Sequence, residues 1–256
     1  MKAKSKILIA IPSLGFDPSE AAIPWQYLTK QYEVQFATPD GLKGAADAVM
    51  LSGKGLGIWK ASLQASKDAK QAYQAMEKDE LFNNPIAYDE IEPNDFLAIL
   101  LPGGHDKSIK PYLESKVLQQ KIVNFFSLNK PVAAVCHGVL LVARSIDPKT
   151  EQSILYQRKT TGLLRKQERL AYHLTRWWKG DYFLTYPATN VEDEVKSLLE
   201  NYDQFVKGPQ PLFRDNENNT KRGFCLRDGN YLSARWPGDI HCFSQAFLQL
   251  LEQQSN

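Results

Sequence analysis

The sequence is poor in the residues that hold metal ions and disulfide bonds. Its 256 residues include three cysteines, Cys136, Cys225 and Cys242, and four histidines. There is no Cys-x-x-Cys pair and no Cys/His set with the spacing of a metal site, so we expect neither a disulfide framework nor a structural zinc. We predict no metal and no cofactor. An odd number of cysteines without such spacing also favours a reducing compartment, and we predict a cytoplasmic protein.

The sequence also lacks a charge excess and a long apolar run. The net charge of +2 is too small to indicate a nucleic-acid or membrane partner. The apolar run near the N-terminus ends at Pro12 after five residues, which is too short for a signal peptide or a membrane span. The glycine-rich segment Ser52–Gly57 lacks the Walker pattern and is interpreted as an ordinary loop. The partner that remains is a small-molecule substrate.

One stretch carries a strong chemical signal. Val132–Val135 is a short apolar run, Cys136 and His137 follow it, and Gly138 allows a tight turn into a helical pattern. A sharp strand-to-helix turn lifts its hinge side chain above the edge of a sheet. It also points the first N–H groups of the helix at that side chain, so the sequence predicts a cysteine with a lowered pKa. Cys225 and Cys242 are predicted to be core residues.

Strands and helices alternate along most of the chain. Buried strands are expected over 6–11, 33–38, 95–101 and 132–135, and amphipathic helices over about 20–30, 117–128, 163–179, 191–201 and from Asp239 onward. Extended segments are expected over 153–156 and 158–161, and a hairpin over 223–227 and 230–234 around Asp228-Gly229. This order predicts the α/β class, a flavodoxin-like three-layer sandwich with a mostly parallel central sheet and helices on both faces.

Three loops follow strand ends, where open parallel sheets place their sites. Cys136 is the candidate nucleophile, and the N–H groups of Gly104 and His137 are candidates for an oxyanion hole. Glu20 lies in the first turn of its helix, with Ser19 as the expected N-cap. It is either a proton relay beside the thiol or a solvated carboxylate at a helix start.

The double glycine after the 95–101 strand marks a second wall of this cleft. Gly103 lets the backbone approach closely, and His105 either lines the pocket or lies in a surface loop. His173 and His241 are predicted to lie on helix surfaces.

Several of these segments together resemble the ThiJ/PfpI superfamily, the class I glutamine-amidotransferase-like α/β sandwich. The matching segments are Glu20–Pro24, Leu101–His105, Ala134–Gly138 and Arg235–Gly238. The resemblance covers almost the whole chain and implies one domain over 1–256. Residues 42–92, which contain a polar helix over 68–82, and about 163–220 would then be insertions or cap elements.

The Gly-Gly-His sequence looks most like the heat-shock chaperone/glyoxalase III branch. That resemblance implies a homodimer and a Cys–His–acid triad, with Glu168 as the acid and Asp181 and Asp147 as alternatives. The leading functional prediction is a glutathione-independent glyoxalase III or deglycase-like enzyme with a role in stress protection, which would convert methylglyoxal to lactate. An intracellular cysteine peptidase or amidase, and a redox-sensing or holdase chaperone without catalysis, are the alternatives.

Overall fold

A seven-stranded sheet forms the centre of the protein. The structure, a computed structural model, describes residues 4–254, and the strand order is β10-β11-β7-β6-β1-β3-β5. The strands are β1 (Lys6–Ala10), β3 (Glu33–Thr38), β5 (Ile86–Ala87), β6 (Ala98–Leu101), β7 (Val132–Val135), β10 (Cys225–Asp228) and β11 (Tyr231–Ala234). All neighbouring strands are parallel except β10 and β11, which form the predicted hairpin at one edge.

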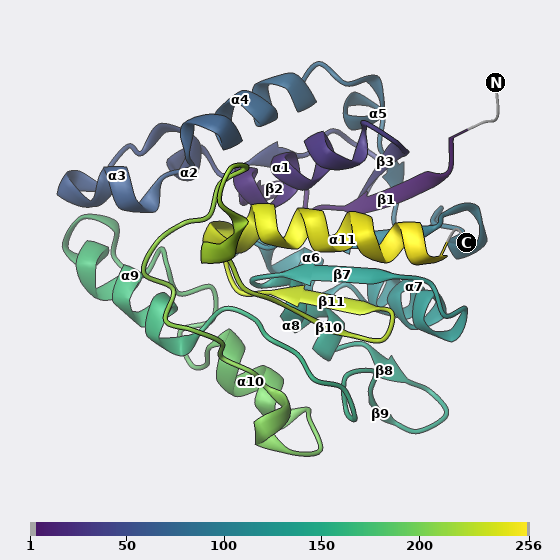
Figure 1. The fold of residues 1–256 in the computed structure, drawn as a ribbon. Coiled ribbons are helices and arrows are strands. Elements are labelled where there is room, and N and C mark those ends of the chain that lie inside the picture. Colours follow the sequence, from purple (N-terminus) through teal and green to yellow (C-terminus); the bar gives the residue numbers. More distant parts are fainter. Residues whose placement is uncertain (1–3, 255–256) are drawn as a thin grey trace.

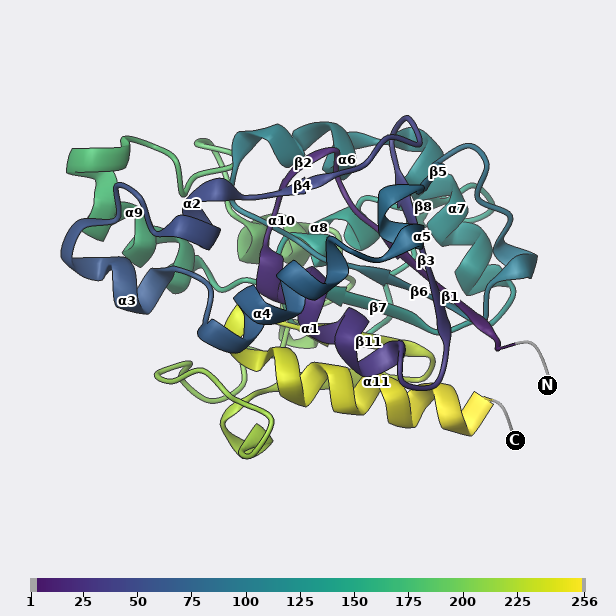
Figure 2. The same cartoon turned by 90° about the horizontal axis from the view of Figure 1, so that it is seen from above.

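Helices cover both faces of this sheet, as the sequence predicts. Helices α1 (Pro18–Leu28) and α11 (Ile240–Gln254) lie on one side, and α6 (Lys110–Glu114), α7 (Lys116–Ser127) and α8 (Gly138–Ala143) lie on the other (Figures 1 and 2). The residues of β6 and β7 are all buried. A parallel sheet needs this covering because both of its faces are apolar. The α/β three-layer prediction is confirmed.

Two sets of predicted boundaries are wrong. Helix α1 is capped by Asp17, whose Oδ1 accepts from the N–H groups of Ser19 and Glu20 at 2.7 and 3.2 Å. The reason is Pro18, which suits the first helical position and moves the cap one residue before it. The expected strand over 95–101 begins only at Ala98, because Pro93–Asp95 form a 3₁₀ turn.

The segments around the insertions also differ from expectation. The helix expected over 68–82 is divided into α4 (Lys67–Met76) and α5 (Glu80–Asn83). The extended pair over 153–161 is absent from the described chain. Instead β8 (Ile146–Asp147) pairs with β9 (Gln152–Ser153), and Thr160 makes an isolated bridge to Phe205. Short segments such as these gain their conformation from tertiary partners rather than from local pattern.

The remaining strands and helices surround the end of the molecule opposite the N-terminus or lie between it and the sheet. They are β2 (Leu14–Phe16), β4 (Ala45–Ala46), α2 (Ala48–Ser52), α3 (Lys60–Leu63), α9 (Arg165–Lys179) and α10 (Val191–Ser197). Figure 1 places α2, α3 and α9 together at the left, although they come from two distant parts of the sequence. Met50, Leu56 and Phe183 join the two parts in a small second core, which we call the cap cluster.

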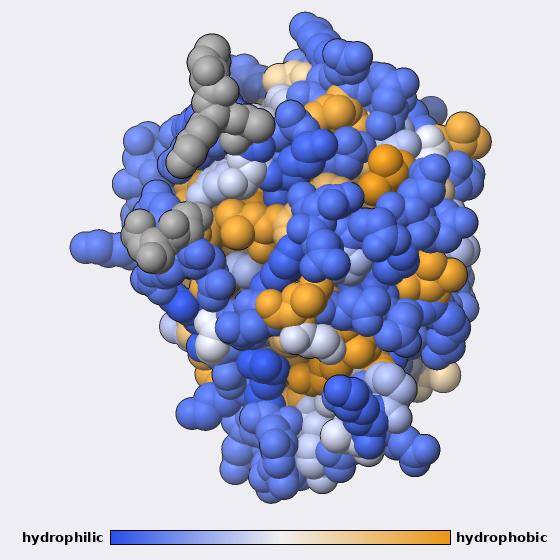
Figure 3. Space-filling view, turned by 90° about the vertical axis from the view of Figure 1, so that its right-hand side faces the viewer, coloured by the Kyte–Doolittle hydropathy of each residue, from blue (hydrophilic) through white to orange (hydrophobic). Residues whose placement is uncertain are grey.

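Helix α9 packs on the rest of the protein with only part of its apolar surface. Trp178 lies against the backbone of Gly57, so one side of the helix does contact the other half of the cap. Trp177 and Leu170 are 80% and 58% exposed, so part of the apolar stripe stays on the surface. On the face drawn in Figure 3, the hydrophobic residues form small groups separated by hydrophilic ones. Among the described residues, none of the helices combines the length and the apolar composition needed to cross a membrane.

Candidate active site

Cys136 occupies a strained turn between β7 and α8. Its φ of 58° lies in the left-handed region, which costs a non-glycine residue free energy and is found at functional turns. The Cys136 N–H donates to the Ala234 carbonyl at 3.2 Å, which fixes the turn to the end of β11. Gly138 is required there, because a Cβ at this position would lie 2.1 Å from the Leu101 carbonyl oxygen. The geometry is that of the predicted nucleophile elbow.

Glu20 reaches the same point from the first turn of α1. Its Oε2 accepts from the Gly103 N–H at 2.8 Å, while Oε1 is buried without a hydrogen-bond partner in the described chain. Burial, and then the nearby charge of Asp17, raise the pKa of Glu20 well above its ordinary value. Glu20 is 0% exposed, so the solvated-carboxylate interpretation is wrong, and burial favours the protonated form of the carboxyl.

The Cys136 thiol does not have the lowered pKa that the sequence predicts. The thiol is 0% exposed, and burial raises its pKa well above the ordinary value, with Glu20 and Asp17 adding to the effect. The backbone N–H of His137 lowers the pKa of the thiol, as predicted, but this effect is smaller than the rise caused by burial. Burial destabilises the thiolate by more free energy than the N-terminus of one helix stabilises it. The resting cysteine is therefore a neutral thiol.

His137 supplies a neutral proton acceptor next to this thiol. Its Nδ1 lies 3.6 Å from the Cys136 Sγ, and its Nε2 is buried without a hydrogen-bond partner in the described chain. Burial, followed by His105 and Arg144, lowers the pKa of His137 well below its ordinary value. The rings of His105 and His137 meet edge to face, with centroids 5.7 Å apart.

The structure does not bring the three candidate acids to His137. Glu168 is buried in α9, and its Oε2 accepts from the Val191 N–H at 3.3 Å. Asp181 pairs with Lys107 on the surface, and Asp147 accepts from a backbone N–H in its own turn. Because His137 Nε2 has no partner among the described residues, the Cys–His pair is formed here without a third member.

The two N–H groups named for an oxyanion hole are both available. Within residues 4–254 the Gly104 N–H donates to no acceptor, and the His137 N–H is directed at the Cys136 thiol. Gly103 lies between them, and a Cβ there would be 2.6 Å from the His137 nitrogen and 3.0 Å from the Cys136 Cβ. The double glycine thus lets the loop after β6 approach the elbow closely.

A cavity of about 550 Å³ opens between the cap and this site. His105 and Asp17 are among its lining residues, which makes His105 a pocket residue, whereas Cys136, His137 and Glu20 are not among them. Its other walls are mostly apolar and include Leu63, Leu163, Leu174, Phe183, Phe213 and Trp236. Arg214 is the cation on its wall. In the described chain no carboxylate lies within 4 Å of the Arg214 guanidinium.

Arg214 and the cap cluster were missed by the sequence interpretation. Arg214 lies in a polar loop of 207–220 that offers no periodicity and no motif, and Phe183 follows α9 in another loop. Only the tertiary arrangement brings them over the sheet. Asp17 could have been found, because Asp-Pro at a helix start is a recognisable capping signal.

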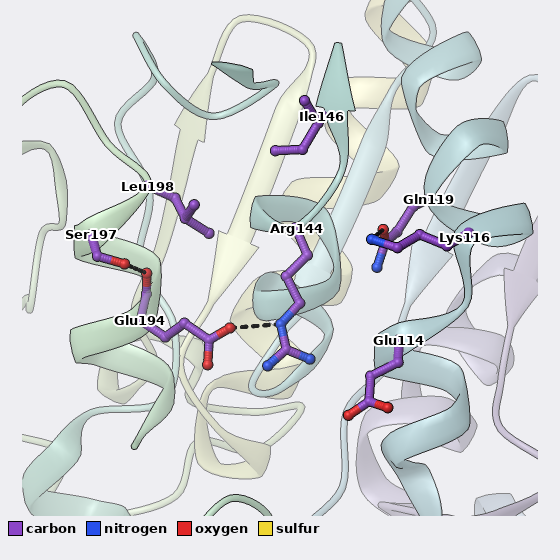
Figure 4. Close-up of a pocket in the computed structure, with 8 residues that line it drawn as sticks. All are labelled: Glu114, Lys116, Gln119, Arg144, Ile146, Glu194, Ser197 and Leu198. Carbon is purple, nitrogen blue, oxygen red and sulfur yellow. Dashed lines mark hydrogen bonds and ion pairs between the residues drawn. The ribbon is translucent and has the colours of Figure 1, made fainter. Parts of the chain in front are cut away.

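A second cavity, of about 510 Å³, lies at the other end of α8 (Figure 4). Its charged lining residues already have partners, because Arg144 donates to Glu194 at 2.6 Å and to the Tyr186 hydroxyl at 2.8 Å. Its lining contains no cysteine or histidine. Over residues 4–254 no group of three His, Cys, Asp or Glu side chains is arranged to hold a metal ion.

The two remaining histidines have different environments. His173 is exposed on α9, as expected. The prediction for His241 is wrong, because this residue is 4% exposed and contacts the Tyr27 hydroxyl at 3.2 Å and Asp68 at 2.9 Å. Helix α4 packs against α1 and covers the face on which His241 lies, so a polar residue there needs these partners.

Glu168 makes the stability of the protein depend on pH. Burial raises its pKa from 4.5 to about 7, so the folded state binds a proton that the unfolded chain releases. Stability should therefore fall as pH rises from about 4.5 to about 7, by roughly 3 kcal/mol. Other buried carboxyls such as Asp215 contribute in the same direction, so Glu168→Gln should reduce the fall by this amount, which denaturant unfolding at pH 4.5 and 8 would measure. The exposed Glu200→Gln should keep the wild-type slope, and an unchanged slope in Glu168→Gln would contradict the assignment.

The fold and the buried cysteine elbow define this protein as an α/β sandwich with a thiol at the carboxyl ends of its central strands. A family model described as ThiJ/PfpI family-like matches residues 11–209, and the chain belongs to the ThiJ/PfpI family.

Named relatives and solved structures agree with this membership. The chain is 26% identical over 170 residues to "Deglycase TK1284" of Thermococcus kodakarensis, covering 66% of this chain and 70% of that protein. It is 25% identical over 182 residues to an uncharacterized Schizosaccharomyces pombe protein, C14C4.04, covering 66% of this chain and 67% of the other. The glyoxalase III structure from Candida albicans superposes with a TM-score of 0.69 at 19% identity, covering 96% of this chain and 97% of that one. The Rapid Encystment Protein of Francisella tularensis gives 0.67 at 15% identity, covering 96% and 99%. The structural matches establish the fold, and the sequence matches make the chain a distant relative of deglycases.

Proposed function

We propose that this protein is a cysteine-dependent enzyme that acts on small 2-oxoaldehydes and converts methylglyoxal to lactate without metal or glutathione. The observation that carries the proposal is that two buried proton-transfer groups lie beside the Cys136 thiol. His137 Nδ1 is 3.6 Å from its sulfur, and the Glu20 carboxyl is held next to it by the Gly103 N–H at 2.8 Å. A base and an acid are thus held next to one buried nucleophile. This is the arrangement that proton transfer between adjacent carbons needs.

The reaction begins with addition of the thiol to the aldehyde. As the Cys136 sulfur bonds to the aldehyde carbon, its proton moves to His137 Nδ1, which lies 3.6 Å away. The aldehyde oxygen gains negative charge, which the N–H groups of Gly104 and His137 stabilise before it is protonated. The product of this step is a hemithioacetal.

The second stage moves one proton. A base removes the hydrogen from the former aldehyde carbon, the electrons shift into an enediol, and an acid delivers a proton to the neighbouring carbon. The result is a thioester of 2-hydroxypropionate on Cys136, which water hydrolyses to lactate and the free thiol. Glu20 and His137 are the residues we assign to this exchange. The net change is addition of one water molecule to methylglyoxal.

The test is lactate formation from methylglyoxal in a buffer free of metals and low-molecular-weight thiols, followed by the same reaction in D₂O. Wild-type protein should form lactate that carries deuterium at carbon 2, because the enediol is protonated from groups that exchange with solvent. Absence of lactate would overturn the proposal, and lactate without deuterium would mean either that one buried group returns the same proton before it exchanges with solvent or that hydride transfer replaces the enediol.

Replacing Glu20 separates catalysis from stability. Glutamine resembles the protonated carboxyl in shape and charge, so Glu20→Gln should fold with almost unchanged stability. It cannot exchange protons, so kcat should fall by roughly 10²–10⁴-fold. Lactate assays with Glu77→Gln, an exposed carboxylate on the same face of the fold, provide the control. Near-normal kcat in Glu20→Gln would remove Glu20 from the mechanism.

Amide or peptide hydrolysis remains the competing reaction for the same nucleophile. It needs a histidine that is oriented by a partner, and His137 Nε2 has none among the described residues. Accumulation of a stable acyl-enzyme on Cys136 with ester or peptide probes, in a protein that makes no lactate, would favour that alternative.

A further inference from the structure

Two cysteines outside the active site lie against each other. Cys225 opens β10 and Cys242 lies in the first turn of α11, and their sulfur atoms are 3.4 Å apart as free thiols. Both side chains are only partly buried, and Cys225 packs against the main core, so the prediction of core residues holds in part for Cys225. They lie at the edge of the sheet because β10 is its last strand.

Both backbones are fixed in this arrangement. The carboxylate of Asp215 accepts from the N–H groups of His241 and Cys242 at 3.3 and 2.7 Å. The Phe224 N–H, next to Cys225, donates to Asp239 Oδ1 at 2.9 Å. A disulfide bond is about 2.05 Å long, so the sulfur atoms need to approach by only about 1.4 Å.

We propose that Cys225 and Cys242 form a reversible redox pair, which hydrogen peroxide converts to an intramolecular disulfide independently of Cys136. The thiolate of Cys242 attacks one peroxide oxygen and displaces hydroxide, which leaves a sulfenic acid. The Cys225 sulfur then attacks this sulfur, the S–S bond forms, and water leaves. Together two thiols and one peroxide give one disulfide and two waters. The two electrons lost by the sulfurs reduce the peroxide.

The surroundings distinguish the two sulfurs. The Cys225 thiol contacts the Cys242 sulfur, and this contact lowers the pKa of Cys242 while the pKa of Cys225 is raised. Cys242 also lies in the first turn of α11, where a helix N-terminus stabilises a thiolate, so we take Cys242 as the attacking residue and Cys225 as the resolving one. Cys136 is 0% exposed with a raised pKa, so it reacts more slowly with a reagent in solution.

The disulfide would have a defined structural effect. It would join the edge strand to the last helix across a sequence separation of 17 residues, and so restrict the unfolded chain. It would also fix the first turn of α11, whose Cys242 N–H donates to Asp215. Asp215 is next in sequence to Arg214, which lines the cavity. We expect the oxidised protein to have a Tm higher by roughly 5–10 °C.

The experiment uses the full chain carrying Cys136→Ser, which leaves only the two thiols in question. After treatment with a small excess of peroxide, the intact mass should fall by two hydrogens, and peptide mapping should find Cys225 linked to Cys242 in a monomer. A reductant should restore the mass and the original Tm. Cys225→Ser and Cys242→Ser, each in the same background, should show neither the link nor the rise in Tm. Wild-type protein, alkylated before and after oxidation, checks the result without substitution.

Three outcomes would overturn the proposal. The first is stepwise oxidation of both cysteines to sulfinic acids without a link. The second is a disulfide between two chains. The third is an unchanged mass under conditions that oxidise an exposed thiol of a separate control protein. None of these outcomes depends on lactate formation, so the redox pair and the proposed function fail or stand separately.

Discussion

Cys136→Ser should lower kcat/KM for methylglyoxal at least about a thousandfold. The hydroxyl is similar in size to the thiol and can occupy the same buried turn, so the fold should survive. The loss comes from chemistry, because a serine hydroxyl in this site would have to ionise against the same burial with a far weaker nucleophile. Steady-state lactate assays and a thermal unfolding curve measure the two effects separately.

The matched control is Cys225→Ser, which removes a thiol on the opposite side of β11 from the elbow. Its activity should equal that of the wild type under reducing conditions. If Cys136→Ser kept more than a tenth of the wild-type rate, Cys136 would not be the nucleophile, whatever the status of the family resemblance.

Gly138→Ala should destabilise the protein by roughly 3 kcal/mol or more. The added methyl would lie 2.1 Å from the Leu101 carbonyl oxygen and 2.9 Å from that of Pro102, and both belong to the backbone beside the neighbouring strand. Relief requires β6 and β7 to separate, which breaks the pairing at the centre of the sheet. Alanine has the higher helix propensity, so intrinsic preference alone would predict the opposite sign. Denaturant unfolding provides the measurement.

Gly162→Ala is the appropriate comparison. A Cβ there would meet only side-chain atoms, those of Val139 at 3.3 Å and of Val191 at 3.5 Å, which can shift slightly. We expect a change within about 1 kcal/mol. Equal losses in the two variants would mean that backbone crowding at the elbow is not the cause.

The order of strands and helices could be predicted because each carries its own local pattern. Val132–Val135 and Gly138 identify the elbow from adjacent residues, and Glu20 follows from its place in the first helical turn. Family resemblance added the expectation of a triad. The choice of Glu168 failed to place an acid at His137 because it depends on where α9 lies, and position along the sequence does not determine that.

The electrostatics of the site were beyond local prediction for a related reason. A helix N-terminus next to a cysteine predicts an acidic thiol, but the sign of the shift depends on how much water reaches it. Here the residues around Cys136 come from two distant segments that meet there, the start of α1 with Glu20 and the loop after β6 with Gly103. Nothing in either segment alone indicates that meeting.

The covering of Cys136 has a consequence for how its reactivity is measured. A residue with 0% exposure meets an alkylating reagent only when the structure opens locally, so its labelling rate is the rate of an open thiol multiplied by the open fraction. Each tenfold slowing relative to that open thiol corresponds to about 1.4 kcal/mol of opening free energy. Alkylation of Cys136 therefore reports how often the structure opens around the elbow, and a small reagent and a bulky one would report openings of different size.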